Sequence, residues 1–181
     1  MKATGIVRRI DDLGRVVIPK EIRRTMRIRE GDPLEIYTSS DGEVIFRKYS
    51  VLGEMTENAA QVAEIIQRLA GCPVLVFDRD HVIAVSGAQK KEFHERRISQ
   101  ELEDLIEARR NYYAPSGTAH LRPVEGLSRT ALACMPVLTA GDVTGAVAFL
   151  DSTDGKVSAP SDLQCSLISA AAQFLGRQME S

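Results

Sequence analysis

The first fifty residues alternate short apolar runs with turn residues, a pattern typical of small β-rich domains. Residues 5–10 and 15–18 are apolar enough to predict two short strands, and the Asp-Asp-Leu-Gly sequence at 11–14 has the chemistry of the turn between them. Pro19 ends the second strand and suits the first turn of a helix over residues 20–26. We therefore predict strand, strand and short helix, in that order.

A second hairpin follows this helix. Leu34–Tyr37 and Val44–Phe46 flank Ser-Ser-Asp-Gly at 39–42, which is a strong turn signal. A domain of about fifty residues buries little apolar surface and usually needs a partner chain, a metal or disulfides. This segment contains no cysteine and no histidine, so we predict an obligate dimer.

The pattern changes to a helical period after the hairpin. Apolar residues recur at steps of four and three, at Met55, Ala59, Val62, Ile66 and Leu69. Such a stripe is typical of ordinary core packing and also of a helix that pairs with another subunit. Both interpretations stay open from the sequence alone.

The remaining segments predict a sheet flanked by helices. Apolar runs predict strand pairs over 74–77 with 82–85 and over 131–138 with 143–150, and helical spacing predicts helices over 98–110 and 161–179, the last capped by Ser161. The expected fold class is α+β.

Composition narrows the class of protein. The chain is 44% apolar, which is enough for a globular core, and it contains no run of eighteen apolar residues and no signal-peptide pattern. We therefore expect a cytoplasmic protein. The three cysteines, Cys72, Cys134 and Cys165, are too far apart and too few for a disulfide framework or a zinc site. We recognise no phosphate loop, metal spacing or cofactor motif, so we expect no cofactor and no metal.

The net charge of −2 conceals a difference between the two ends of the chain. Residues 1–50 carry eleven basic and eight acidic side chains, whereas the rest carries twelve basic and seventeen acidic ones. Between Arg8 and Arg29 there are eight basic residues and three acidic ones. Positive charge at this density favours a nucleic-acid surface, although a solvated basic face is the more common meaning of a charge run.

The N-terminal residues resemble the AbrB-type swapped-hairpin DNA-binding domain. The resemblance rests on Thr-Gly-Ile-Val-Arg at 4–8, Asp-Asp-Leu-Gly-Arg-Val-Val-Ile-Pro at 11–19 and Glu-Ile-Arg-Arg at 21–24. In that family two chains interleave their hairpins into one barrel-like dimer that presents arginines to double-stranded DNA. Carried over by position, the DNA-binding residues would be Arg8, Arg15, Arg23 and Arg24. The sequence does not say which of them contacts bases and which contacts phosphates.

The C-terminal part resembles a GAF domain, a small-ligand sensor fold whose helices pair between subunits. We expect the DNA-binding domain over residues 1–52 and a GAF-like sensor and oligomerisation domain over 53–181. The order of the two domains makes the chain similar to a family of sporulation regulators that act in the forespore, on the nucleoid. That resemblance implies a homotetramer built as a dimer of dimers, both activation and repression, and no membrane partner. A small ligand at the GAF domain is part of this hypothesis, with an identity that the sequence does not reveal.

Two other classes of protein remain as alternatives. Some GAF-fold proteins are thiol enzymes that reduce free methionine sulfoxide, but none of the three cysteines lies beside a histidine or a basic cluster in the sequence. Swapped-hairpin domains also occur in antitoxins, which carry a disordered toxin-binding tail, whereas residues 161–179 are periodic and apolar. We therefore predict a regulator and not an enzyme.

Overall fold

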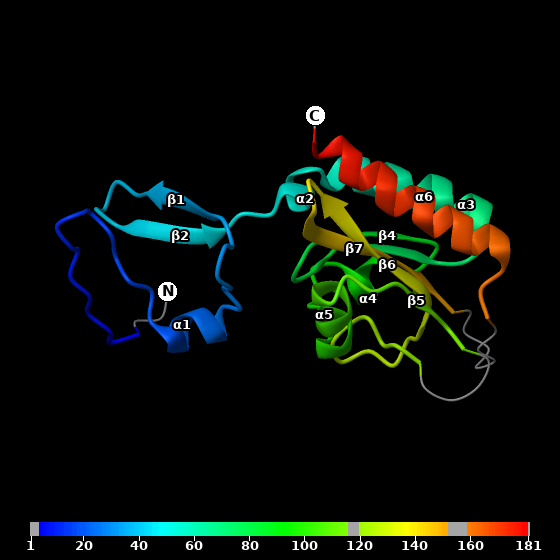
Figure 1. Cartoon of the computed structure of the whole chain (residues 1–181), viewed down its shortest axis with the longest axis horizontal. Coiled ribbons are helices and arrows are strands. Elements are labelled where there is room, and N and C mark those ends of the chain that lie inside the picture. Colours follow the sequence, from blue (N-terminus) through cyan, green and yellow to red (C-terminus); the bar gives the residue numbers. More distant parts are fainter. Residues whose placement is uncertain (1–3, 116–119, 152–158, 181) are drawn as a thin grey trace. The chain divides into compact units, whose positions relative to one another are not determined.

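A computed structural model of the chain describes residues 4–115, 120–151 and 159–180. The chain divides into two compact units, Met1–Tyr49 and Ser50–Ser181 (Figure 1). The domain boundary predicted from the sequence, after residue 52, lies within helix α2 (Val51–Glu54).

The N-terminal unit contains the predicted short helix and the predicted second hairpin. Helix α1 spans Lys20–Thr25. Strands β1 (Leu34–Thr38) and β2 (Val44–Lys48) pair antiparallel. The Lys48 ammonium donates to the Arg27 carbonyl at 2.9 Å and so ties the end of β2 to the turn after α1.

The two strands predicted over 5–10 and 15–18 are not strands in the single chain. The Asp11 amide donates to the Arg15 carbonyl at 3.0 Å and the Gly14 amide donates to the Asp11 carbonyl at 3.0 Å, so the turn between the two segments does form. Beyond this turn the two segments run apart as an open loop (Figure 1). A strand needs a neighbour that takes up its backbone hydrogen bonds, and no segment of the described chain lies in that place.

The N-terminal unit has almost no core of its own. Apart from Pro19, no apolar side chain among residues 4–49 is buried. Val7, Ile10 and Val17 are exposed to 84%, 71% and 70%. Water therefore contacts apolar surface that a folded domain normally removes from solvent.

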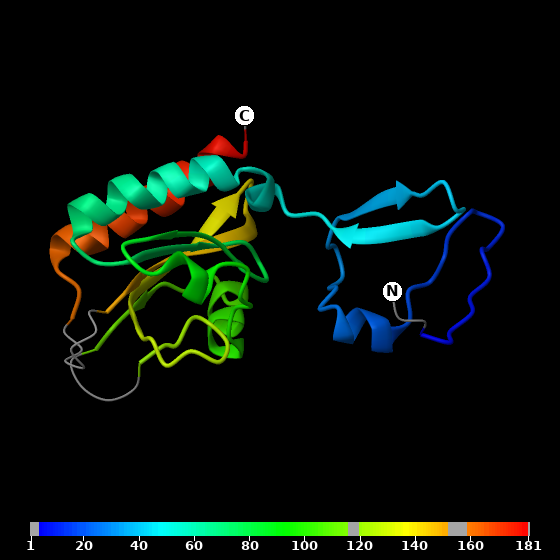
Figure 2. The ribbon, with the colours of Figure 1, turned by 180° about the vertical axis from the view of Figure 1, so that it is seen from behind.

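The C-terminal unit is a three-layer domain around one antiparallel sheet. In addition to α2, its elements are α3 (Thr56–Ala70), β3 (Val74–Phe77), β4 (Val82–Ser86), α4 (Lys90–Phe93), α5 (Gln100–Glu107), β5 (Tyr112–Tyr113), β6 (Ala131–Thr139), β7 (Asp142–Leu150) and α6 (Asp162–Gln178). The strand order is β4-β3-β7-β6-β5. Helices α3 and α6 lie side by side on one face of the sheet in both views, and α4 and α5 lie on the other (Figures 1 and 2).

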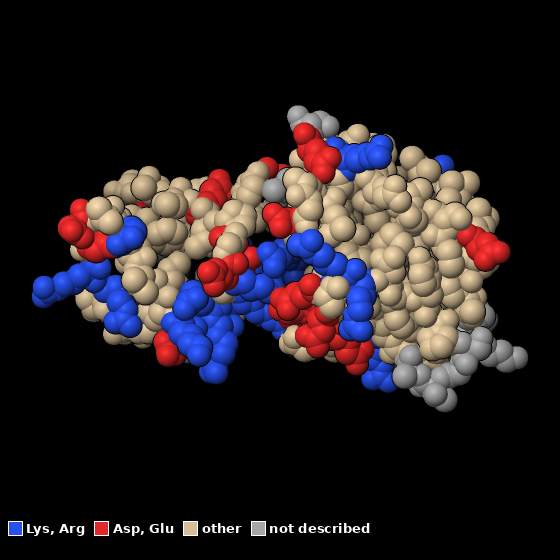
Figure 3. Space-filling model, viewed as in Figure 1, with Lys and Arg blue, Asp and Glu red and all other residues tan. Residues whose placement is uncertain are grey.

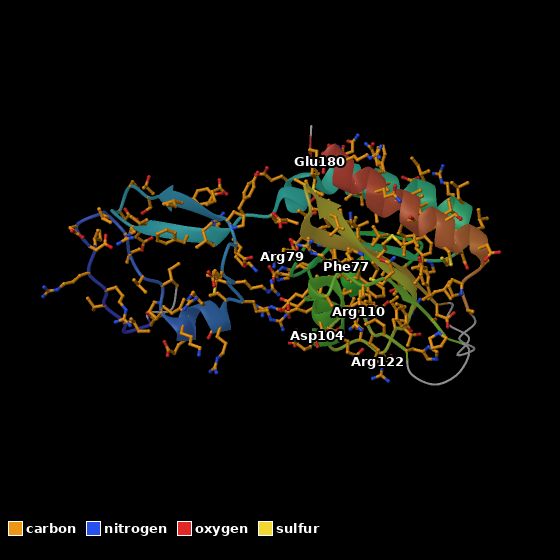
Figure 4. The ribbon with its side chains drawn as sticks, in the orientation of Figure 1. Phe77, Arg79, Asp104, Arg110, Arg122 and Glu180 are labelled. Carbon is orange, nitrogen blue, oxygen red and sulfur yellow. The ribbon has the colours of Figure 1, made fainter. Side chains whose placement is uncertain are left out.

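Successive side chains along each strand point to opposite faces of the sheet and so fill a core layer on each face. Val74 and Val76 of β3 pack in the layer under α3 and α6, whereas Leu75 and Phe77 pack in the layer with α4 and α5. All four side chains are fully buried, and Phe77 is labelled inside the unit in Figure 4. The sheet is therefore covered on both sides.

The longer elements predicted from the sequence are confirmed, and their ends follow from local chemistry. Gly71 ends α3 in the left-handed conformation with a φ of 67°. Ser161 caps α6 through a capping box with Gln164. Sequence reasoning missed the short elements α2, α4 and β5, which contain at most four residues each.

The stripe predicted on α3 serves mainly as core packing. Ala59 and Ile66 are buried and Val62 packs against the same core layer, whereas Leu69 is 58% exposed. The neighbouring Ile65, which the predicted stripe omitted, is 59% exposed. The exposed apolar side chains of α3 are therefore Ile65 and Leu69, and most of the predicted stripe faces the core.

Helix α2 is fixed to the sheet through one close contact. Its Leu52 is completely buried in the core layer under α3 and α6. A Cβ atom at Gly145 of β7 would collide with the Phe77 carbonyl oxygen and with the Leu52 side chain. Glycine at this position lets α2 pack directly on the sheet.

Candidate nucleic-acid interface

All four arginines expected to contact DNA are exposed in the N-terminal unit. Arg8 lies on the open segment before the first turn, Arg15 follows that turn, and Arg23 and Arg24 lie on α1. Lys and Arg side chains gather over α1 in Figure 3. Helix α1 has no fully buried residue, and Arg23 and Arg24 on it are exposed to solvent.

Arg15 differs from the others because it is held by an acidic residue of the same turn. The Arg15 Nε atom donates to Asp11 Oδ2 at 2.8 Å. The backbone amides of Arg15 and Leu13 donate to Asp11 Oδ1 at 2.7 Å and 3.1 Å. The hydrogen bond from the Arg15 amide is the main cause that lowers the pKa of Asp11, so this carboxylate is charged at neutral pH. Both the turn and the direction of the Arg15 side chain depend on one carboxylate.

The two arginines of α1 make weaker contacts. The Arg23 Nε atom donates to the Ile18 carbonyl at 3.2 Å, which is a neutral and longer bond. Within the described chain, the Arg24 side chain has no hydrogen bond or ion pair. Arg8 makes a 3.4 Å bond to the carbonyl of the residue before it, which is too long to fix the side chain. These three guanidinium groups can therefore reorient toward a ligand.

Fewer basic side chains are exposed in this segment than the sequence count suggests. Of the eight basic residues counted between Arg8 and Arg29, Arg27 and Arg29 are only half exposed. Lys20 and Arg9 are exposed beside the four expected residues. Sequence reasoning missed the role of Asp11 at this surface, and the available signal was an aspartate four residues before an arginine across a tight turn.

Cys72 and Cys134 do not form a catalytic pair. Cys72 lies in the core layer under α3 and α6, whereas Cys134 lies in the layer on the opposite face of the sheet. Burial raises the pKa of Cys72 to about 11 and that of Cys134 to about 12, so neither forms a thiolate at neutral pH. These two buried thiols therefore give the thiol-enzyme alternative no support.

A hollow of about 510 Å³ lies beside β4 in the C-terminal unit. Its lining carries two imidazoles, two carboxylates and one hydroxyl, from His81, His94, Asp78, Glu95 and Thr56. In the part of the chain that the structure describes, no three His, Cys, Asp or Glu side chains are placed to hold a metal ion. Among the same residues, no helix is long and apolar enough to cross a membrane.

Comparison with known families assigns both parts of the chain. Residues 54–180 match the family described as stage V sporulation protein T C-terminal, transcription factor. Residues 7–51 match the family described as antidote-toxin recognition MazE, bacterial antitoxin. The C-terminal fold is also similar to a GAF domain/HD domain protein from Geobacter sulfurreducens, with a TM-score of 0.50, 17% identity, and coverage of 72% of this chain and 93% of that chain.

Two curated proteins of Bacillus subtilis (strain 168) are similar in sequence. The stage V sporulation protein T is 46% identical over 184 residues, which cover 99% of each chain. The transition state regulatory protein AbrB is 49% identical over 69 residues, which cover 35% of this chain and 71% of that protein. Full-length similarity to a sporulation protein disfavours the antitoxin alternative. The chain therefore belongs to the stage V sporulation protein T family of transcription factors, with an AbrB-like N-terminal DNA-binding domain and a GAF-like C-terminal domain.

Proposed function

We propose that this regulator contacts double-stranded DNA through Arg8, Arg15, Arg23 and Arg24. The observation that carries the proposal is their common exposure on one small unit, where three of the four guanidinium groups have no carboxylate partner among the described residues. A guanidinium group offers a fork of donors that fits both phosphates and guanine edges. Residues 1–52 then form the DNA-binding domain, and 53–181 the sensor and oligomerisation domain.

The proposed DNA-binding form is a homodimer of interleaved N-terminal units. The apolar side chains of Val7, Ile10 and Val17 are uncovered in one chain, and the segments that carry them lack strand partners. A second copy supplies both the missing apolar contacts and the missing backbone hydrogen bonds. Two-fold symmetry then presents eight arginines to one DNA duplex.

Two such dimers are proposed to join through α3 and α6 into a tetramer. These helices run antiparallel, since Gln164 Nε2 donates to the Ala70 carbonyl at 3.1 Å and Asn58 Nδ2 donates to Gln178 Oε1 at 3.5 Å. Their outward surface carries large apolar side chains that are 50–59% exposed, at Ile65, Leu69, Leu163 and Phe174. Apolar residues at steps of four and eleven along two paired helices suit a four-helix contact between subunits.

Sedimentation velocity of the Ile65→Glu variant tests this helical contact. We expect the tetramer to dissociate into dimers that keep their fold, because a charge replaces an apolar side chain at the contact. Lys91→Glu, at an exposed position of α4 on the opposite face of the sheet, is the matched control and should leave the tetramer intact. A tetramer that survives Ile65→Glu and Phe174→Glu together would refute this part of the proposal.

Genome-wide footprinting in sporulating cells tests the function itself. We expect bound sites upstream of genes expressed in the forespore, where the protein lies on the nucleoid in the cytoplasm. Transcript levels in a deletion strain should rise at some of these genes and fall at others, because the proposed regulator both activates and represses. A complete absence of bound sites would overturn the proposal.

The proposal includes a small ligand in the hollow beside β4. Thr56, at the start of α3, lines this hollow, and α3 directly follows α2, the first helix of the C-terminal unit. A bound ligand would change DNA affinity if it favours one arrangement of the DNA-binding units. Thermal-shift screening of small polar metabolites tests this idea, with His81→Ala as the control. A metabolite that stabilises both proteins equally does not bind in the hollow.

A further inference from the structure

Asp11 and Arg15 form an ion pair that leaves the two terminal nitrogens of the guanidinium group free. The carboxylate holds Arg15 through Nε, with its other oxygen bound to the backbone of the same turn. Within the described chain, neither terminal nitrogen of Arg15 has a hydrogen bond. These two nitrogens are the pair that an arginine uses to reach the O6 and N7 atoms of guanine in the major groove.

Two hydrogen bonds fix the backbone between Asp11 and Arg15. The Asp11 amide donates to the Arg15 carbonyl at 3.0 Å, and the Arg15 amide donates to Asp11 Oδ1 at 2.7 Å. The same oxygen accepts from the Leu13 amide at 3.1 Å. The carboxylate thus sets the turn and aims the side chain that leaves it, so Arg15 is oriented before it meets DNA.

The negative charge of Asp11 also bears on which group Arg15 can contact. A carboxylate 2.8 Å from the guanidinium offsets part of its positive charge and repels a phosphate that approaches the same side. A guanine edge is neutral and is recognised by directed hydrogen bonds, so it loses less from this repulsion. Arg8, Arg23 and Arg24 have no such carboxylate beside them in the described residues, which suits contacts to phosphate.

We infer that Asp11 is a positioning residue for sequence recognition, which aims the terminal nitrogens of Arg15 at a guanine while the other three arginines bind the DNA backbone. This inference rests on the proposed function, because it assumes that the N-terminal unit contacts DNA through these arginines. The inference adds which arginine contacts a base and which contact phosphates, a distinction that the sequence leaves open.

The test compares Asp11→Asn with Asp12→Asn in the full-length protein. Asparagine at 11 keeps an oxygen for the amides of the turn but removes the charge that holds Arg15. Asp12→Asn is the matched control, since it removes the same charge from the same turn and Asp12 makes no bond to Arg15. Fluorescence anisotropy measures affinity for a duplex recovered by footprinting and for poly(dA-dT), a non-specific DNA whose major groove offers no guanine O6 and N7 pair.

We expect Asp11→Asn to lower affinity for the recovered duplex by roughly a hundred-fold, because the proposed dimer loses one well-formed arginine–guanine pair in each subunit and each pair is worth about ten-fold. Affinity for poly(dA-dT) should stay the same or rise, because a repulsive charge is removed and no arginine–guanine pair is lost. Asp12→Asn should not lower the ratio of specific to non-specific affinity. Equal effects of the two substitutions, or an equal loss on both DNAs, would overturn the inference.

Arg15→Lys separates recognition of a base from contact with a phosphate. Lysine keeps the positive charge but loses the fork, so specific affinity should fall about as far as in Asp11→Asn, and the double variant should fall no further. Replacing the contacted guanine with 7-deazaguanine should weaken the unaltered protein and leave both variants almost unaffected. If Arg15→Lys binds the duplex normally, Arg15 is a phosphate contact and the inference is wrong.

These outcomes stand apart from failure of the proposed function. If the unaltered protein binds neither DNA, the arginine surface is not an interface and the proposed function falls with the inference. If it binds both, and Arg24→Ala weakens both, the proposed function stands whatever the result for Asp11. The thermal midpoint of each variant identifies any loss that comes from unfolding.

Discussion

Replacing Arg24 with alanine should reduce the salt dependence of DNA binding without changing the fold. The Arg24 side chain is exposed and has no hydrogen bond or ion pair within the described chain, and α1 buries none of its residues. Alanine is also a good helix former, so the free energy of unfolding should change by less than about 0.5 kcal/mol. Any loss of DNA binding then reports the missing cation.

The size of the effect follows from counterion release. Each phosphate that a protein neutralises contributes about −0.9 to the slope of log affinity against log salt concentration. The proposed dimer loses two guanidinium groups in this variant, so the slope should become shallower by about 1.8. The loss of affinity should be similar for specific and non-specific DNA, because phosphates carry no sequence information.

Fluorescence anisotropy titrations at four or five salt concentrations measure this slope. Arg110→Ala is the matched control, because Arg110 is an exposed arginine of the C-terminal unit without a bond to its side chain in the described residues (Figure 4). An unchanged slope for Arg24→Ala, or an equal change for Arg110→Ala, would refute the electrostatic reasoning. Loss of the dimer in sedimentation would show that Arg24 supports assembly instead.

Two further predictions concern the C-terminal unit. Gly145→Ala should lower the free energy of unfolding by about 1–3 kcal/mol in urea titrations, because the new methyl group collides with the Phe77 carbonyl and Leu52; an unchanged value would mean that α2 does not pack tightly on β7. Stability should fall as the pH rises above about 9, because thiols ionise there in the unfolded chain, whereas the folded pKa of Cys134 is about 12 and that of Cys72 about 11. The protonated thiols therefore contribute their full stabilisation only below the pKa of the unfolded chain. Cys134→Val removes one of these thiols, so the free energy of unfolding should fall less steeply between pH 9 and 11.

The sequence by itself determined the elements whose pattern is local and long. Strands β6 and β7 are mostly apolar and flank a short turn, and α6 begins directly after Ser161 because the capping residues Ser161 and Gln164 lie within four positions of each other. The exposure of Arg23 and Arg24 also followed from sequence, since charged side chains on a short helix remain in water unless a partner buries them.

Only the tertiary structure decided features that depend on distant neighbours. The segments 5–10 and 15–18 have strand-like sequences, yet they are not strands in one chain because pairing requires a second backbone. Periodicity placed Ile66 and Leu69 on one stripe of α3, but packing against the sheet and α6 decided that Ile66 is buried and Leu69 is 58% exposed. The sheet likewise decided that Cys72 and Cys134 lie on opposite faces.

The arginine surface combines both kinds of information. Sequence resemblance selected Arg8, Arg15, Arg23 and Arg24, because a long motif carries their positions. It could not distinguish Arg15 from the others, because that distinction lies in a 2.8 Å contact with Asp11 that forms when the turn closes. Sequence determines which charges are present, whereas folding determines what each charge faces and therefore what it is free to bind.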